Sequence, residues 1–203
     1  MFIRSILVFC FLLAQGCSTF MTGDDPPSIP KDSFMIDKEV SYELIGWQED
    51  SSKKLASEIL RTIHLSNRFK KISFHSKSDT EIKIQIVLEK APRLGLLFGE
   101  QPQPVSWMVE KKPIQFSLYI LNRLLAIRTY FIIPILQKSE DKVVFRVWKW
   151  NRKIGEYSYS IDSVQAFGWV SLGLLFIDDR EKIRSAYSVY AEKFLSDSRA
   201  IYQ

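Results

Sequence analysis

The spacing of apolar residues predicts strands early in the chain, with one amphipathic helix between them. In residues 39–47 apolar side chains alternate with polar ones, which is typical of a half-buried strand. From residue 50 the period changes, because Leu55, Ile59 and Ile63 recur every four residues and would share one face of a helix. Alternation returns in two further predicted strands, residues 69–76 and 80–90.

The second half begins with a long apolar run. Residues 113–138 contain Arg123 and Arg128 in the middle of this run. A charge at bilayer depth costs about 2.5–3.5 kcal/mol on insertion scales, which argues against a membrane span. We therefore interpret the run as buried strands that end at Pro134.

A hairpin and a final helix complete the pattern. Residues 142–150 and 155–162 alternate and predict a hairpin, with Gly155 as the bulge residue. Residues 178–202 carry an apolar stripe at helical spacing, and Asp178 and Asp179 are expected to cap this helix. The order predicts an α+β fold: a mostly antiparallel sheet or sheets, an amphipathic helix after the first strand, and a C-terminal helix packed on the sheet.

The first residues carry the features of a secretory signal peptide. Arg4 supplies a positive charge, the apolar run that follows is too short to span a bilayer, and small residues lie just before Cys17. The stretch "LLAQGC" resembles the lipobox of bacterial lipoproteins. This resemblance implies cleavage before Cys17 and attachment of acyl chains to its sulfur and amino group. An ordinary signal peptide with an incidental cysteine is the alternative.

Attachment of acyl chains to Cys17 would have consequences for the thiols and for the location of the protein. Cys10 would leave with the signal peptide, so no disulfide can form within one mature chain. By resemblance to known sorting rules, Ser18 after the cysteine favours the outer membrane. We expect an envelope protein that faces the periplasm or the cell surface.

Composition then divides the chain. Residues 1–16 are the predicted signal peptide, and residues 17–37, with three prolines, are a predicted tether that begins at the lipidated cysteine. Residues 38–203 form one predicted domain. Two sub-units, residues 38–90 and 114–203, would be joined by an irregular loop at residues 91–113.

The net charge of +5 is small. It fits a solvated surface or contact with anionic lipid headgroups, and we expect no nucleic-acid partner. His64 and His75 have no second histidine or cysteine at ligand spacing, so no metal site and no cofactor are predicted. Ser171 resembles a nucleophile elbow only superficially, because the preceding glycine is one position too far away.

Two stretches are candidate contact surfaces. The letters LGLLF occur twice: the second copy is expected in the core, while the first lies in the irregular loop and is a candidate contact with a partner or a membrane. The residues of that candidate contact are Leu94, Leu96, Leu97, Phe98 and Trp107. Arg146, Trp148 and Trp150 would share one strand face and could stack on a ligand. Core packing with the arginine reaching the edge is the favoured alternative.

The passage "LASEILRTIHLSNRFKKISF" resembles a helix-to-strand passage of small periplasmic α/β lipoproteins. The resemblance implies an accessory subunit of envelope assembly, secretion or transport machinery. We therefore favour a membrane-anchored, non-catalytic binding, structural or accessory module with an envelope protein partner. A carrier of lipid or another apolar ligand, and a hydrolase with scattered catalytic residues, remain alternatives, so the presence of an enzyme activity stays open.

Overall fold

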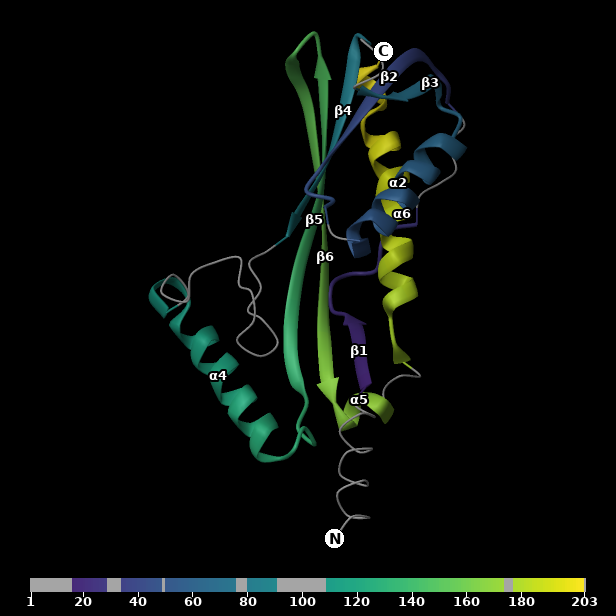
Figure 1. Cartoon of the computed structure of the whole chain (residues 1–203). Helices are drawn as coiled ribbons and strands as arrows, with labels where there is room; N and C mark the ends of the chain where they lie inside the picture. The colour runs from purple at the N-terminus through teal and green to yellow at the C-terminus, as the bar shows by residue number, and fades with distance from the viewer. Residues whose placement is uncertain are drawn as a thin grey trace. The chain divides into compact units, whose positions relative to one another are not determined.

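A computed structural model describes residues 16–28, 34–48, 50–75, 80–90, 109–173 and 177–202. These residues form an α+β fold around a six-stranded sheet with the strand order β1-β6-β5-β4-β2-β3 (Figure 1). The strands are β1 (Gly16–Met21), β2 (Ile36–Ile45), β3 (Phe69–Phe74), β4 (Ile82–Lys90), β5 (Ile135–Lys149) and β6 (Arg152–Gly168). The helices are α2 (Asp50–Leu65), α4 (Pro113–Arg128), α5 (Trp169–Gly173), α6 (Arg180–Asp197) and the 3-10 turn η3 (Arg199–Ile201).

The sheet is mostly antiparallel, as predicted. β1 pairs antiparallel with β6, and β5 and β6 form a hairpin. Side-chain contacts between β5 and β4 run in opposite directions along the two strands, from Arg146–Glu89 to Lys149–Glu81. Only β2 pairs parallel, with β3 on one side and with β4 on the other. The predicted helix after the first strands and the predicted C-terminal helix are both present.

The chain divides into two compact units. The first comprises residues Met1–Gly23, Lys90–Glu140 and Asp162–Glu181, and the second comprises Asp24–Glu89, Asp141–Ile161 and Lys182–Gln203. This division differs from the expected sub-units 38–90 and 114–203. The expected boundary followed the chain order, whereas the observed one cuts across β5 and β6, which are long enough to contribute to both units.

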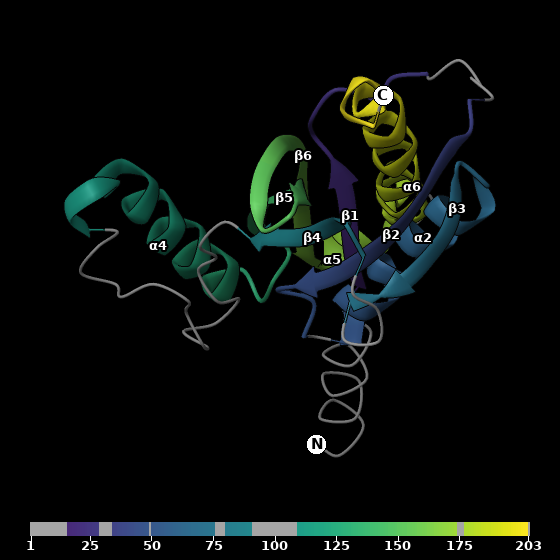
Figure 2. The ribbon, with the colours of Figure 1, turned by 90° about the horizontal axis from the view of Figure 1, so that it is seen from above.

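The core of the second unit lies between its sheet and the two helices α2 and α6. The alternation in β2 and β4 buries Val40, Ile84 and Ile86, which face the apolar stripe of α2. The two helices lie side by side on the same face of the sheet, where Arg184 of α6 pairs with Glu58 of α2 at 2.6 Å (Figure 2). The largest fully buried side chains of this core are Tyr187, Phe145, Phe194, Ile59 and Ile86.

The turn of the long hairpin differs from the prediction. It is formed by Trp150 and Asn151, whose φ angles are 48° and 61°. Positive φ at both central residues matches the right-handed twist of the flanking strands. Gly155, predicted as the bulge, lies within β6 instead, and a Cβ atom there would collide with Ile201. The glycine therefore lies at a close approach to the end of the Ile201 side chain and not in the turn.

The apolar run after residue 113 forms helix α4, so the prediction of buried strands was wrong. Periodicity alone does not distinguish a buried strand from a buried helix in an apolar run. Pro113 at the first turn suits a helix start, because its missing N–H would be unpaired there in any case. The strand begins only after the turn, at Ile135.

Part of the segment expected as a tether is strand β1. The N–H groups of Thr19 and Met21 donate to Asp178 and Asp179 at 2.9 and 3.0 Å. These two carboxylates, expected to cap the C-terminal helix, thus accept hydrogen bonds from the outer edge of β1. The reason is that the unpaired N–H groups of an edge strand need acceptors.

Candidate functional site

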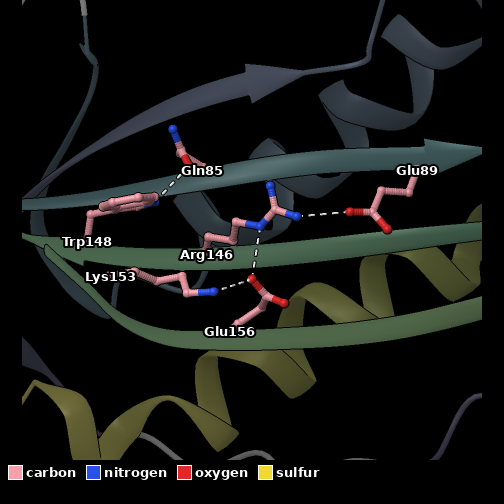
Figure 3. Close-up of polar contacts among 6 residues, drawn as sticks. All are labelled: Gln85, Glu89, Arg146, Trp148, Lys153 and Glu156. Atoms are coloured by element: carbon pink, nitrogen blue, oxygen red, sulfur yellow. Dashed lines mark hydrogen bonds and ion pairs between the residues drawn. The ribbon is translucent and has the colours of Figure 1, made fainter. Parts of the chain in front are cut away.

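The polar face of the second unit's sheet gathers charged side chains from β4, β5 and β6 (Figure 3). Arg146 Nη2 donates to Glu89 Oε1 and Arg146 Nε donates to Glu156 Oε2, both at 3.0 Å. Lys153 Nζ also donates to Glu156 Oε2 at 3.0 Å. Two cations and two carboxylates are therefore joined in one network across three adjacent strands.

Trp148, two residues after Arg146, belongs to a second network on the same face. Its Nε1 donates to Gln85 Oε1 at 2.7 Å, and Gln85 Nε2 donates to Glu43 Oε2 at 2.8 Å. Lys83 Nζ lies 3.6 Å from Glu43 Oε2 and 5.7 Å from the centroid of the Trp148 ring. The indole is thus held by a hydrogen bond at its edge and a cation over its face.

Hydrogen bonds lower the pKa values of two carboxylates on this face, Glu156 and Glu43. Hydrogen bonds from Lys153 and then Arg146 hold the pKa of Glu156 below its ordinary value. The hydrogen bond from Gln85 is the largest cause of the lowered pKa of Glu43, and Lys83 adds to it. Exposed pairs of this kind contribute little to stability. The face is locally neutralised, and a charged ligand would have to compete with these internal partners.

The stacking face predicted from Arg146, Trp148 and Trp150 divides at the hairpin turn. Arg146 and Trp148 lie on the polar face, opposite the fully buried Phe145 and Val147. Trp150 lies in the turn and is 75 % exposed. Neither an exposed stacking face nor core packing describes this face completely. Its side chains lie outside the core but are hydrogen-bonded to neighbouring side chains. A ligand role for the three residues stays a prediction.

One pair of side chains bears on the hydrolase alternative. Ser41 Oγ lies 3.3 Å from His75 Nδ1, with Glu43 two residues further along β2. The Ser41 side chain is fully buried and also donates to the carbonyl oxygen of Ile82. A substrate carbonyl could not approach this hydroxyl, so the pair gives no support to a serine nucleophile.

The other candidates for chemistry have structural partners. The ring of His64 packs edge-on to Tyr42, with centroids 6.3 Å apart. Ser171 is buried, accepts a hydrogen bond from the Gly168 N–H at 3.1 Å and donates to the Gly168 carbonyl. Within the described ranges, no group of three potential ligand side chains could hold a metal ion.

The cavities of the second unit bear on the carrier alternative. The apolar cavity between α2 and the sheet has a volume of about 10 Å³, roughly the space of one water molecule. A larger depression of about 240 Å³ lies beside Phe34, Met35 and Tyr202. The guanidinium groups of Arg68 and Arg199 lie 4.4 and 4.8 Å from the centroid of the Phe34 ring at the edge of this depression.

The predicted loop contact lies outside the described residues. This applies to Leu94, Leu96, Leu97, Phe98 and Trp107, and also to residues 174–176 of the second LGLLF copy. Residues 1–15 of the predicted signal peptide, which was expected to span residues 1–16, lie outside as well. The first described positions are Gly16 and Cys17.

The first unit places the predicted lipid attachment site directly on a strand. Cys17 is the second residue of β1, and its backbone pairs with Phe167 of β6. Ser18, which was expected to act in sorting, is fully buried, and its hydroxyl donates to the Ser171 carbonyl at 2.7 Å. The backbone next to Cys17 is therefore fixed in the sheet.

Helix α4 in the same unit contains a residue that sequence reasoning undervalued. Arg123 is 3 % exposed, lies 3.6 Å from the centroid of the Tyr119 ring, and donates to the Leu136 carbonyl at 3.1 Å. Burial lowers its pKa from the ordinary arginine value. Tyr119, Arg123 and Ala126 share one helical face, so a helical interpretation of the run would have revealed this inward polar stripe. No helix in the described part of the chain is long and apolar enough to cross a membrane.

No protein-family model and no curated protein matches the sequence. Among solved structures, the chain is similar to a minor lipoprotein from Acinetobacter baumannii, with 12 % identity, a TM-score of 0.36, and coverage of 80 % of this chain and 91 % of that one. It is also similar to rare lipoprotein B from Shewanella oneidensis, with 9 % identity, a TM-score of 0.34, and coverage of 81 % and 99 %. A dodecamer of PelC from Paraburkholderia phytofirmans gives 10 % identity, a TM-score of 0.33, and coverage of 90 % and 95 %. Similarities of this size assign no family and no function.

Proposed function

We propose that the chain is a bacterial envelope lipoprotein, held to a membrane by acyl chains on Cys17, that acts as a non-catalytic binding or accessory module. The observation that carries the proposal is the stretch "LLAQGC", whose final cysteine, Cys17, lies in β1. Each buried CH₂ of an acyl chain contributes about 0.8 kcal/mol, and several chains on one residue anchor a protein firmly. Attachment then needs no spanning helix.

The accessory role is favoured over catalysis by the way the polar groups are engaged. The charged face around Arg146 is satisfied internally, and the Ser41 hydroxyl is buried beside His75. Neither arrangement leaves an activated nucleophile at a surface that a substrate could reach. The location we propose is the outer membrane, on its periplasmic or outer face.

The anchor is tested by metabolic labelling of the full chain with an alkyne analogue of palmitate. The wild type should take up the label, and Cys17→Ala should lose it, because the thiol that receives the lipid is gone. Cys10→Ala is the matched control, since it removes the other cysteine and should leave the label in place. Mass spectrometry of the N-terminal peptide should show a diacylglyceryl group on Cys17. A processed wild-type chain with an unmodified cysteine would overturn the proposal.

The accessory role needs a separate measurement. Crosslinking in intact cells, followed by affinity capture of the full chain, should recover a defined envelope complex whose composition is reproducible. Recovery of the chain alone under all crosslinking conditions would count against a partner-binding role. It would leave the anchor untouched.

A further inference from the structure

The apolar face of helix α4 points away from the protein, whereas an ordinary surface helix turns its apolar face toward the core. The apolar side chains of α4 point outward, and six of them are between 40 and 76 % exposed. They are Ile114, Leu118, Leu121, Leu124, Leu125 and Ile127. The side that faces the protein instead buries Tyr119 and Arg123, where the guanidinium finds an aromatic ring and a backbone carbonyl. A helix of this polarity is suited to apolar surroundings on its outer side.

Hydrogen bonds from one side chain fix this orientation. Asn122 Nδ2 donates to the Pro134 carbonyl at 2.9 Å, and Asn122 Oδ1 accepts from the Leu136 N–H at 3.0 Å. Pro134 directly precedes β5 and Leu136 is its second residue, so α4 cannot rotate its leucines inward without breaking these bonds. The exposed apolar face is therefore built into the fold.

The apolar surface continues past the end of α4 into the turn before β5. Tyr130 and Ile132 are 78 % and 62 % exposed. This turn is tied to the end of β6, because Trp169 Nε1 donates to the Tyr130 carbonyl and Trp169 N–H donates to the Phe131 carbonyl at 3.0 and 2.9 Å. Figure 1 shows the end of α4, the start of β5, α5 and β1 near one another.

The turn also lies next to the predicted lipid attachment site. The Phe131 ring packs edge-on against the Phe167 ring at 5.9 Å between centroids. Phe167 is the residue that pairs with Cys17 across β1 and β6. Cys17 therefore lies one strand spacing from Phe167, whose ring contacts the exposed turn, and no flexible linker would separate the acyl chains from the folded unit.

Cations bracket the apolar face. Lys111 and Lys112 precede α4 and Arg128 ends it, and all three are exposed. Such side chains reach the headgroups of anionic lipids while the apolar face enters the boundary of the acyl chains. A helix of 16 residues is about 24 Å long, which suits a helix lying in the interface rather than one spanning the bilayer.

We infer that the outer face of α4 and the turn at residues 130–133 lie on the surface of the bilayer that holds the Cys17 acyl chains, next to anionic headgroups. The inference rests on the proposed function, because the anchor brings this face to the membrane. A bilayer is favoured over a second copy of the chain because the bracketing cations and the adjacent attachment site both point to lipid. The first unit would then contact the membrane surface directly and would not be held away from it by a linker.

The test uses the full chain, processed in cells and reconstituted in vesicles of phosphatidylcholine and phosphatidylglycerol. Once Cys10 has left with the signal peptide and Cys17 is acylated, Leu121→Cys adds the one free thiol, which takes an environment-sensitive nitrobenzoxadiazole dye. We expect a blue-shifted emission and loss of most of it when a doxyl-labelled lipid is included. Glu192→Cys, at an exposed position of α6, should show neither effect.

The outcomes separate this inference from the proposed anchor. An acylated chain whose Leu121→Cys dye emits as in water would overturn the inference and leave the anchor intact. A blue shift without quenching by doxyl lipid, together with Leu121→Cys crosslinking between chains, would show that a second copy covers the face and would also overturn it. If mass spectrometry finds no acyl group, the anchor proposal fails. Flotation of Cys17→Ala with the same vesicles then decides the inference: it stands if the chain floats and Leu118→Asp abolishes this, and it fails otherwise.

Discussion

Trp150 and Asn151 adopt a backbone conformation that most residues avoid. Both have positive φ, which costs an ordinary L-residue about 1–2 kcal/mol, whereas glycine and asparagine tolerate it. We expect the double variant Trp150→Asn, Asn151→Gly to raise the free energy of unfolding by about 1 kcal/mol, because Asn-Gly is the preferred pair in such a turn. Urea denaturation measures the change.

Trp150→Ala is the matched control, since it removes the exposed ring and keeps the Cβ atom at positive φ. It should be no more stable than the wild type. If the double variant proves less stable than this control, the strain argument is wrong.

The sequence located this hairpin but misplaced its turn. Alternation identified both strands, because period-2 patterns record which side chains are buried. The turn was assigned toward Gly155, since glycine is the usual residue where φ is positive. What the sequence could not show is that the end of the Ile201 side chain, 46 positions later, lies against this glycine and would have to shift to admit a Cβ atom. Close approaches between distant residues leave no local signal.

Strand β1 depends on a pair of aspartates for the hydrogen bonds of its outer edge. We expect Asp178→Ala with Asp179→Ala to loosen β1, because the N–H groups of Thr19 and Met21 would lose their acceptors. An unsatisfied buried donor costs about 1–3 kcal/mol, and these groups are only partly buried, so the loss should fall toward the lower end. Hydrogen exchange at residues 18–21 should accelerate, with smaller changes in β4.

Glu192→Ala is the control for that experiment, because it removes an exposed acid from α6 without touching β1. Exchange at residues 18–21 should be the same as in the wild type. Unchanged exchange in the double aspartate variant would show that pairing with β6 alone holds the strand.

Helices and strands were easiest to predict where one face is buried and the other is exposed to solvent. α2, β4 and α6 meet this condition, and their positions follow from periodicity. α4 does not, because its exposed side is apolar and its buried side carries Arg123. A pattern method reads such a helix as uniformly apolar and cannot assign its period. The candidate membrane surface was missed because its apolar side chains face outward. The same feature is what suggests contact with lipid.

At the scale of the whole molecule, the fold class was predictable but the strand order was not. The sequence placed β2, β3 and β4 in succession, yet β2 lies between the other two and pairs parallel with both. The charged contacts among β4, β5 and β6 depend on that order, as does the pairing that places Cys17 beside Phe167. Such pairings are set by packing over the whole chain, and one sequence does not reveal them.

The stability of the molecule should fall in alkaline solution because folding suppresses the ionisation of tyrosines. Burial raises the pKa values of Tyr157, Tyr159 and Tyr202 above the ordinary value of 10, and the Asp197 carboxylate adds to the effect at Tyr159. Above pH 10 the unfolded chain releases these protons while the folded chain keeps them. The unfolded state then binds fewer protons, so the free energy of unfolding decreases as pH rises, by up to about 1.4 kcal/mol per pH unit for each such group.

Tyr159→Phe separates this linkage from ordinary packing. At pH 7 the variant should lose about 1 kcal/mol, because the hydroxyl no longer donates to Asp197 Oδ2 at 2.9 Å. Above pH 10 its free energy of unfolding should decline less steeply than that of the wild type, since one suppressed ionisation has been removed. Urea titrations between pH 8 and about 11.5 measure both effects, and identical alkaline slopes for Tyr159→Phe and the wild type would exclude Tyr159 as a source of the decline.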